Sequence, residues 1–112
     1  MIIEEVIKKH LDKHLKAPSF FEFEEHMPDE FVMVERIGGG RNDKLPNARF
    51  AIQSYSNTLF GAALLNQKVK NVMDLITERN EVSGVRLVSD YNFTDIETRK
   101  YRYQAVYEIY HY

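Results

Sequence analysis

The sequence contains no cysteine and no long hydrophobic run. Without cysteine, the chain can form neither a disulfide framework nor a thiolate metal site. No segment approaches the roughly 18 consecutive apolar residues that a membrane-spanning helix needs. We therefore expect neither a disulfide-stabilised scaffold nor a transmembrane helix.

The chain also lacks an excess of charge of either sign. Its 15 basic and 17 acidic residues give a formal net charge of -2, which predicts no electrostatic footprint for nucleic acid or for an anionic membrane. Hydrophobic residues make up 44% and charged residues 29% of the 112 positions, as in a soluble globular domain. Glu4 and Glu5 near the amino terminus are not typical of a signal peptide. We expect one soluble, cytosolic domain spanning residues 1–112.

Two segments have the apolar spacing of an amphipathic helix. In residues 1–16, apolar side chains recur every three or four positions, and Pro18 ends the helix because proline has no amide proton. A second helix is expected to start at a cap formed by Asn57 or Thr58 and to run to about Arg79. Its apolar stripe consists of Ala62, Leu65, Val69, Val72, Met73 and Ile76.

Five segments are typical of strands. Residues 19–25 alternate between aromatic and acidic side chains. Residues 31–56 indicate a long hairpin whose connection, from Gly38 to Pro46, is rich in turn-forming residues. Its first four residues, FVMV, are apolar without alternation, which predicts that both faces are covered there. Two closing strands follow, at residues 82–93 and 101–112. The expected fold is α+β with the order α-β-β-β-α-β-β, its two helices packed in two layers on a mostly antiparallel sheet.

The most conspicuous motif is three consecutive glycines, Gly38, Gly39 and Gly40, followed by Arg41. Glycine beside a cation occurs in phosphate-binding loops, but those loops need G-x-x-x-x-G-K-[ST] or G-x-G-x-x-G between a strand and a helix. Here no Gly-Lys-Ser/Thr follows, and the next expected element is a strand. We therefore interpret the segment from Gly38 to Pro46 as a flexible hairpin tip, and we expect no bound phosphate and no cofactor.

His10 and His14 are four residues apart on the first expected helix, a spacing that can place two imidazoles on one metal ion. The zinc-peptidase pattern also needs a glutamate directly after the first histidine, where this chain has Leu11. The sequence fixes no third ligand nearby. We therefore predict two solvated histidines on the polar face of the helix, and no metal site.

Carboxylates are frequent between residues 22 and 35, but their pattern is not that of a catalytic site. Alternation places Glu22 and Glu24 on the solvent face of a strand, and Asp29 and Glu30 in a turn. Glycosidase-type catalysis needs two carboxylates in a cleft, one of them with a raised pKa. A nucleophile elbow is also missing. We expect no catalytic residues and no enzymatic activity.

Five of the seven tyrosines lie in the last twelve residues. In a strand over residues 101–112, Tyr103 and Tyr107 share one face, and Tyr110 and Tyr112 lie on the other. Tyrosine suits protein contact surfaces because it joins a large apolar ring to a polar tip. High β-propensity in a partly exposed sheet explains the pattern equally well. Basic side chains in this strand lie opposite most of the tyrosines, so an interleaved nucleic-acid-binding surface is only weakly indicated.

The order of several segments resembles a known family. A strand reading FVMVERIGGGR is followed by a loop with Pro46, the strand ARFAIQSYS, a helix containing AALLNQKVKNVMDLI and a closing TRKYRYQAVYEIYHY. This pattern resembles the tail-terminator proteins, also described as minor capsid or tail-completion proteins, of long-tailed, non-contractile bacteriophages and prophages. The resemblance spans nearly the whole chain. The order and spacing of VERIGGGR and RYQAVYEI carry it, rather than a catalytic motif.

The resemblance implies a structural protein that forms a homohexameric ring on the end of the tail tube, stops tube growth and joins the tail to the head connector. The implied partners are other copies of the chain, the major tail tube protein and the connector or stopper protein, while DNA passes through the lumen without specific binding. The implied location is the host bacterial cytoplasm during assembly and then the head-proximal end of the tail in the virion. The glycine segment would be a mobile arm that orders against a neighbouring subunit or the tube. The interface residues expected on this basis are Arg36, Gly38, Gly39, Gly40, Arg41, Tyr110 and Tyr112.

Two other functions stay open. One is a head-side completion or stopper protein of the same virus particle. The other is a small α+β module that binds nucleic acid or protein, and an oligonucleotide affinity that falls with salt would favour it. For the ring-forming function we expect a monomer, or a mixture of monomers and rings, in dilute solution.

Overall fold

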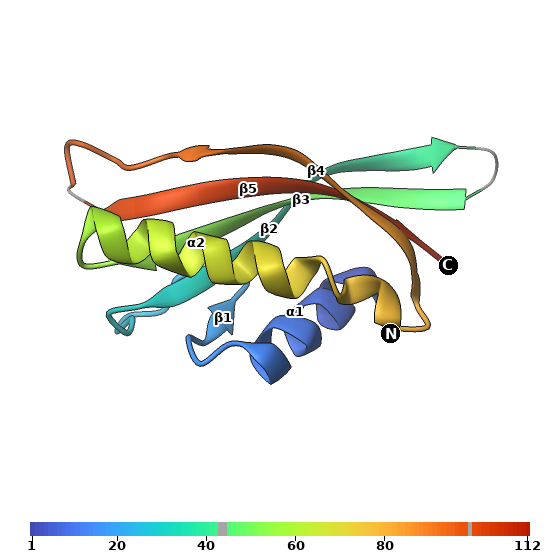
Figure 1. Ribbon diagram of the computed structural model, residues 1–112, viewed down its shortest axis with the longest axis horizontal. Coiled ribbons are helices and arrows are strands. Elements are labelled where there is room, and N and C mark those ends of the chain that lie inside the picture. Colours follow the sequence, from blue (N-terminus) through green and yellow to red (C-terminus); the bar gives the residue numbers. More distant parts are fainter. Residues whose placement is uncertain (43–44, 99) are drawn as a thin grey trace.

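The computed structural model describes residues 1–42, 45–98 and 100–112 of the chain. Two α-helices pack on one face of a five-stranded sheet with the strand order β1-β2-β3-β5-β4 (Figure 1). Strand pairs are antiparallel except β1 with β2, which is parallel. The expected α+β fold and its order α-β-β-β-α-β-β are confirmed. The elements are α1 (Ile3–His14), β1 (Ser19–Phe20), β2 (Phe31–Asn42), β3 (Leu45–Ser56), α2 (Leu59–Met73), the 3-10 helix η1 (Ile76–Glu78), β4 (Val82–Asn92) and β5 (Tyr101–His111).

The main core lies between the helices and the sheet. In α1, Ile3, Ile7 and Leu11 recur at helical spacing and are buried, as the sequence predicts. Glu4 and Glu5 in the first turn of this helix lie where the helix dipole favours negative charge. The strands contribute alternate residues to the core, namely Val32, Val34, Phe50, Ile52, Ala105, Tyr107 and Ile109.

The helix α2 begins at the predicted cap and ends earlier than predicted. Thr58 accepts a hydrogen bond from the amide of Gly61 at 2.9 Å, which is the N-cap interaction. The α-helix ends at Met73, and the chain tightens into η1, so the prediction of a continuous helix to Arg79 is wrong. Because η1 keeps Ile76 fully buried while the chain turns toward β4, the helical spacing of apolar residues continues beyond the α-helix.

The strand predicted over residues 19–25 is wrong beyond its first two residues, which alone pair with β2. The segment then leaves the sheet and packs against the sheet face opposite the helices, here called the outer face. Phe23 lies edge-on to Phe31 and Tyr55, with ring centroids 6.0 and 5.6 Å away. Its alternating aromatics therefore cover the sheet instead of extending it.

The first four residues of β2 are covered on both faces, as their unbroken apolar run predicts. Val32 and Val34 belong to the core beneath the helices, whereas Phe31 and Met33 form a second cluster with Tyr55 on the outer face. The rings of Phe31 and Tyr55 stack with centroids 4.5 Å apart. None of these five side chains is more than 6% exposed.

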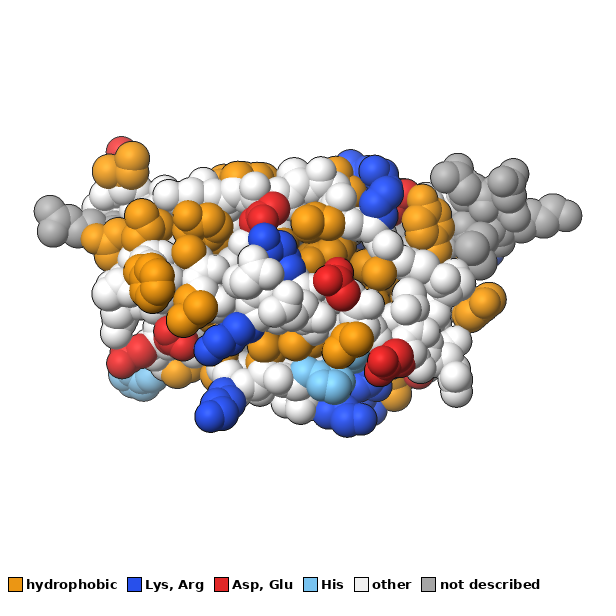
Figure 2. Space-filling model, in the orientation of Figure 1, with side chains coloured by type: hydrophobic (Ala, Val, Ile, Leu, Met, Phe, Trp, Pro, Cys, Tyr) orange, Lys and Arg blue, Asp and Glu red, His pale blue; other side chains and the backbone are white. Residues whose placement is uncertain are grey.

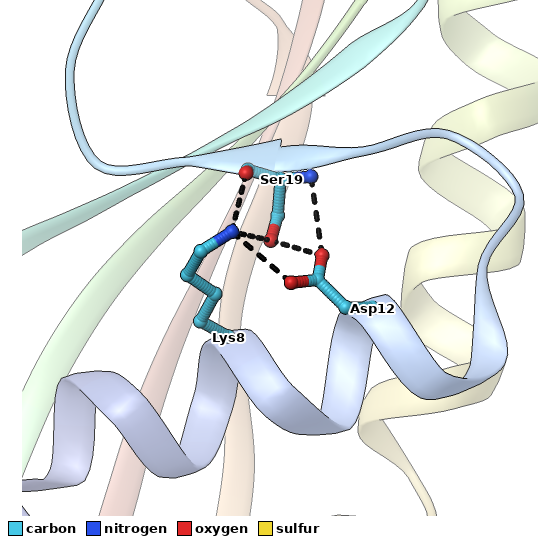
Figure 3. A network of polar contacts seen from close by, with 3 residues as sticks. All are labelled: Lys8, Asp12 and Ser19. Atoms are coloured by element: carbon cyan, nitrogen blue, oxygen red, sulfur yellow. Dashed lines mark hydrogen bonds and ion pairs between the residues drawn. The ribbon is translucent and has the colours of Figure 1, made fainter.

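A polar network fastens α1 to β1 (Figure 3). Asp12 accepts hydrogen bonds from the amide and the hydroxyl of Ser19, at 3.2 and 2.5 Å. Lys8 Nζ donates to the Ser19 carbonyl at 2.6 Å and to the Asp12 carboxylate at 3.0 Å. Ser19 is only 3% exposed, so these side chains satisfy polar groups that water does not reach.

This network predicts the effect of Asp12→Ala. The substitution leaves the buried Ser19 amide without its acceptor, and we expect it to lower the free energy of unfolding by about 1–3 kcal/mol. Urea denaturation of the parent and the variant measures the loss. Asp29→Ala, at an exposed position, is the matched control and should change stability by less than about 0.5 kcal/mol. Equal effects of the two substitutions would contradict the role given to Asp12.

Candidate protein interface

The glycine segment lies in a strand, so the prediction that Gly38 to Pro46 form a long turn is wrong. Pairing of β2 with β3 continues through Gly38↔Arg49 and Gly39↔Ala48 to Asn42↔Leu45. The connecting residues of the expected tip, 43 and 44, lie outside the described residues. The predicted hairpin over residues 31–56 is confirmed, and its far end projects beyond both helices (Figure 1). We call residues 38–42 and 45–48 the hairpin arm.

The three glycines of the arm differ in whether the folded chain leaves room for a side chain. A Cβ on Gly39 would lie 2.8 Å from the Asn47 carbonyl oxygen and 2.8 Å from Arg36 Nη2, so glycine is needed there. A Cβ on Gly38 or Gly40 would meet nothing closer than 3.7 or 4.0 Å. None of the three has the positive φ that favours glycine. The contacts of the folded chain therefore explain one glycine of three.

The two arginines expected at the interface flank these glycines. Arg36 is exposed, its Nη1 lies 3.7 Å from a Glu4 carboxylate oxygen on α1, and its Nε donates to the Gly38 carbonyl at 3.3 Å. Its strand partner, Phe50, points into the core, so Arg36 lies on the helix side of the sheet. Arg41, opposite Pro46, is also exposed. Both guanidinium groups are thus accessible at the arm.

Tyr110 lies beside the base of the arm in a cluster on the outer face. Glu108 accepts hydrogen bonds from Arg49 at 2.9 Å, from Arg86 at 3.1 Å and from the Tyr110 hydroxyl. These bonds, that of Tyr110 first, lower the pKa of Glu108 to about 2. The cluster joins β3, β4 and β5 at this end of the sheet.

The structure brings most of the expected interface residues together. Gly40 pairs with Asn47, and Asn47 pairs with Tyr110, so the glycine segment and Tyr110 are separated by one strand. Tyr112 follows β5 at the same end of the sheet and is 78% exposed (Figure 1). The expected residues therefore occupy one end of the molecule rather than scattered positions.

The two edges of the sheet are a feature that the sequence did not reveal. Among the described residues, only β1 pairs with the outside of β2, and only at Val32 and Met33. The opposite edge is β4, which pairs on one side with β5. Strand order depends on long-range pairing, and no local signal in the sequence gives it. The described part of the chain thus has two different sheet edges with unpaired backbone groups.

Arg102 is engaged within its own chain. Its guanidinium donates to the Tyr55 hydroxyl at 2.8 Å and to the Phe93 carbonyl at 2.6 Å. Its Cζ lies 4.3 Å from the Phe93 ring centroid and 5.7 Å from that of Tyr55, which are cation–π distances. These residues line a groove of about 660 Å³ on the outer face. Arg102 thus links β5 to Tyr55 on β3 and to Phe93 after β4.

The opposite end of the molecule is apolar. Leu59, Phe60 and Leu64 in the first turns of α2 are 41%, 78% and 47% exposed. Figure 2 shows hydrophobic side chains gathered at this end, which lies far from the hairpin arm along the long axis. The two ends of the molecule therefore differ in character, one apolar and one bearing exposed arginines.

His10 is buried, so the prediction of two solvated histidines is wrong for this residue. It is 1% exposed. Its Nε2 donates to the Val72 carbonyl at 2.7 Å, and its Nδ1 accepts from Arg79 Nε at 3.1 Å. His10 therefore links α1 to α2 and to the residue after η1, while His14 stays exposed. Within residues 1–42, 45–98 and 100–112, no group of three His, Cys, Asp or Glu side chains could hold a metal ion.

This environment predicts a pH dependence of stability. Burial lowers the pKa of His10 below its ordinary value of 6.5, and the nearby charges of Arg79 and His14 lower it further, against the opposing effects of the Val72 carbonyl and Glu78. The unfolded chain takes up this proton near pH 6.5, and the folded chain only at lower pH. Stability should therefore fall as the pH drops below about 6.5 and stop falling below the folded pKa.

The measurement is the urea midpoint between pH 7.5 and 5 for the parent and for His10→Gln, which keeps a donor for Val72. We expect this variant to lose much of the pH dependence. His14→Gln, at the exposed histidine one turn away, should keep it. A slope unchanged in His10→Gln would show that other groups cause it.

Glu22 and Glu24 are exposed, as predicted, and so are the other acidic residues between positions 22 and 35, namely Glu25, Asp29, Glu30 and Glu35. Glu22 and Glu35 line the outer-face groove that Arg102 also lines. In the described parts of the chain, no helix is both long and apolar enough to cross a membrane. No model of a protein family matches the chain, and no curated protein matches it either.

Proposed function

We propose that the protein is a tail terminator of a long-tailed bacteriophage or prophage, a non-enzymatic structural protein that assembles into a ring. The observation that carries this proposal is the hairpin arm. It projects from the end of a sheet with two different open edges, and one strand separates Gly40 from Tyr110. The sequence resemblance over nearly the whole chain supports the same function.

A ring of identical subunits needs two different, complementary surfaces on each subunit, so that rotation from one copy to the next closes the assembly. The two open edges of the sheet, on β2 and on β4, are such different surfaces. In the proposed function, a ring, most simply a hexamer, sits on the last ring of the tail tube. It stops further addition of tube protein and presents its other side to the head connector.

The near-balanced charge of the chain fits a ring that lets DNA pass. Its net charge is -2, and strong binding to phosphates would require a basic surface. In this function the partners are other copies of the chain, the tail tube protein and the connector. Assembly takes place in the bacterial cytoplasm, and the ring stays at the head-proximal end of the tail.

The proposal is tested by adding the purified chain to polymerising tail tube protein from the same genome. We expect electron micrographs to show shorter tubes, each closed by a ring at one end. Binding to purified connector in place of tube ends would favour the head-side completion function. Unchanged tubes, together with a salt-dependent affinity for oligonucleotides, would favour the binding module.

A further inference from the structure

The outer side of β2 exposes backbone groups of known direction. The Val32 amide donates to the Pro18 carbonyl at 2.9 Å, on the side away from β3. Because backbone groups alternate in direction along a strand, the amides of Val34 and Arg36 point to this same side. Among the described residues, β1 covers this side only at Val32 and Met33. Beyond Met33, β2 is thus an edge strand whose outward backbone groups have no partner strand among the described residues.

Contacts within the chain do not explain why all three residues on this edge are glycine. Glycine inside a strand is costly, because it loses backbone entropy and packs no side chain. At Gly38 and Gly40, a Cβ would fit without a clash, and the backbone conformation does not require glycine. A strand glycine of this kind often marks the close approach of another backbone. The position of these glycines on the open edge points to a second strand lying against them.

The edge strand β4 offers the matching groups. The Phe93 amide donates to the Arg102 carbonyl on β5 at 2.9 Å, so the backbone groups of Asp90 and Asn92 point away from β5. Leu87 and Val88 on this strand are 44% and 36% exposed. This edge therefore combines unpaired backbone groups with apolar side chains that the described chain leaves exposed.

We infer that the β2 edge of one subunit, from Val34 to Arg41, pairs antiparallel with β4 of the next copy. The inference rests on the proposed ring-forming function and names its subunit contact. The strands β2, β3, β5 and β4 alternate in direction, so β2 of an adjacent copy in the same orientation continues the alternation. The contact is therefore head-to-tail and uses both edges of every subunit.

One register of this pairing places oppositely charged side chains of the two strands next to each other. Asp90 lies opposite Ala105, a core residue, so its side chain is on the helix side of the sheet, as that of Arg36 is. Asp90 accepts hydrogen bonds from Lys70 and Asn66 of its own chain, both at 2.6 Å. When Arg36 faces Asp90 of the next copy, its positive charge meets this carboxylate on the same face of the sheet. Gly38 and Gly39 then face Val88 and Leu87, and Gly40 faces Arg86. The absence of side chains at positions 38–40 leaves room for these residues.

Arg36→Pro tests the backbone contact. Proline removes the outward amide, and an edge position tolerates it. Arg36→Ala is the matched control, because it removes the same side chain and keeps the amide. By native mass spectrometry over a range of concentrations, Arg36→Pro should raise the concentration needed for ring formation at least roughly tenfold above that of Arg36→Ala. Circular dichroism checks that both variants are folded.

Gly40→Val keeps the test decisive if Arg36→Pro fails to fold. Valine favours strands, and a Cβ at Gly40 has space, so the monomer should be at least as stable as the parent. Its side chain should obstruct the neighbouring strand and weaken ring formation at least roughly tenfold. Gly40→Ala should have a smaller effect in the same direction.

The lack of native cysteine permits a direct test of which strands meet. Gly40→Cys protein mixed with Arg86→Cys protein should give a heterodimer with a short bis-maleimide, while each protein alone should stay largely uncrosslinked. An Arg86→Cys homodimer, or the absence of the heterodimer from samples that contain rings, would overturn the inference.

Failure of this inference and failure of the proposed function are distinguishable. Rings that form equally well with Arg36→Pro and Gly40→Val would overturn the edge contact and leave the ring-forming function intact. A parent chain that never associates, either in solution or on tube ends, would contradict both.

Discussion

Replacing Val69 with aspartate should unfold the protein. Val69 is fully buried in α2 and belongs to the main core. An aspartate there would be an unpaired charge among apolar side chains, which costs about 4 kcal/mol or more. Since domains of this size are stable by only about 5–15 kcal/mol, most of the folded population should be lost. Circular dichroism and urea denaturation measure the effect.

Lys68→Asp is the matched control for Val69→Asp. It places the same carboxylate on the neighbouring residue of the same helix, where the side chain is exposed. The control should unfold with a midpoint close to that of the parent. If Val69→Asp unfolds at the same urea concentration as Lys68→Asp, then α2 does not pack on the sheet through this face.

Shortening the hairpin arm should abolish ring formation without unfolding the subunit. In the variant, Asn-Gly replaces residues 40–47, which joins Gly39 directly to Ala48 through a two-residue turn. These two residues are already paired, and Asn-Gly is the preferred sequence for such a turn. The change removes Gly40 and Arg41 from β2, and both residues are exposed. We therefore expect a thermal midpoint within about 5 °C of the parent's.

Ring formation by the shortened chain is measured by native mass spectrometry and by capping of tail tubes. We expect both to fall below detection, because the change removes the projecting part of the arm and, with Gly40 and Arg41, the far end of the β2 edge. The full-length variant Arg41→Ala, which keeps the arm and loses one exposed charge, should still assemble. Shortened protein that forms rings as readily as the parent would show that the arm has no part in assembly.

Much of the fold could be predicted because the signals are local. The apolar stripes of both helices predict which face packs against the sheet, and Thr58 predicts where α2 begins. The unbroken apolar run of FVMV predicts a strand that is covered on both faces. In each case, residues close in sequence determine the outcome, so composition and spacing are enough.

The wrong predictions concern segments whose structure depends on residues far away in the sequence. The glycine segment has the composition of a turn, yet pairing with residues 45–49 of β3 holds it in a strand. His10 resembles a polar surface residue of α1, but Val72 and Arg79, more than 60 positions away, supply its hydrogen-bond partners. Residues 21–25 have strand alternation but pack on the outer face instead. Tertiary contacts override local propensity in all three segments.

The candidate interface was predicted in part. The sequence indicated the glycines, the arginines beside them and the last two tyrosines, and the structure places these residues at one end of the sheet. The open edges of β2 and β4 could not be predicted. They follow from the strand order β1-β2-β3-β5-β4, which depends on pairings between distant segments.

In the proposed function, the chain assembles head-to-tail into a closed ring. Electron microscopy of the purified protein at high concentration, with native mass spectrometry of the same sample, tests it most directly. We expect rings with a central channel and one closed stoichiometry, in exchange with monomers as the protein is diluted. A compact two-fold dimer that persists at every concentration, with no rings in the micrographs, would contradict the account.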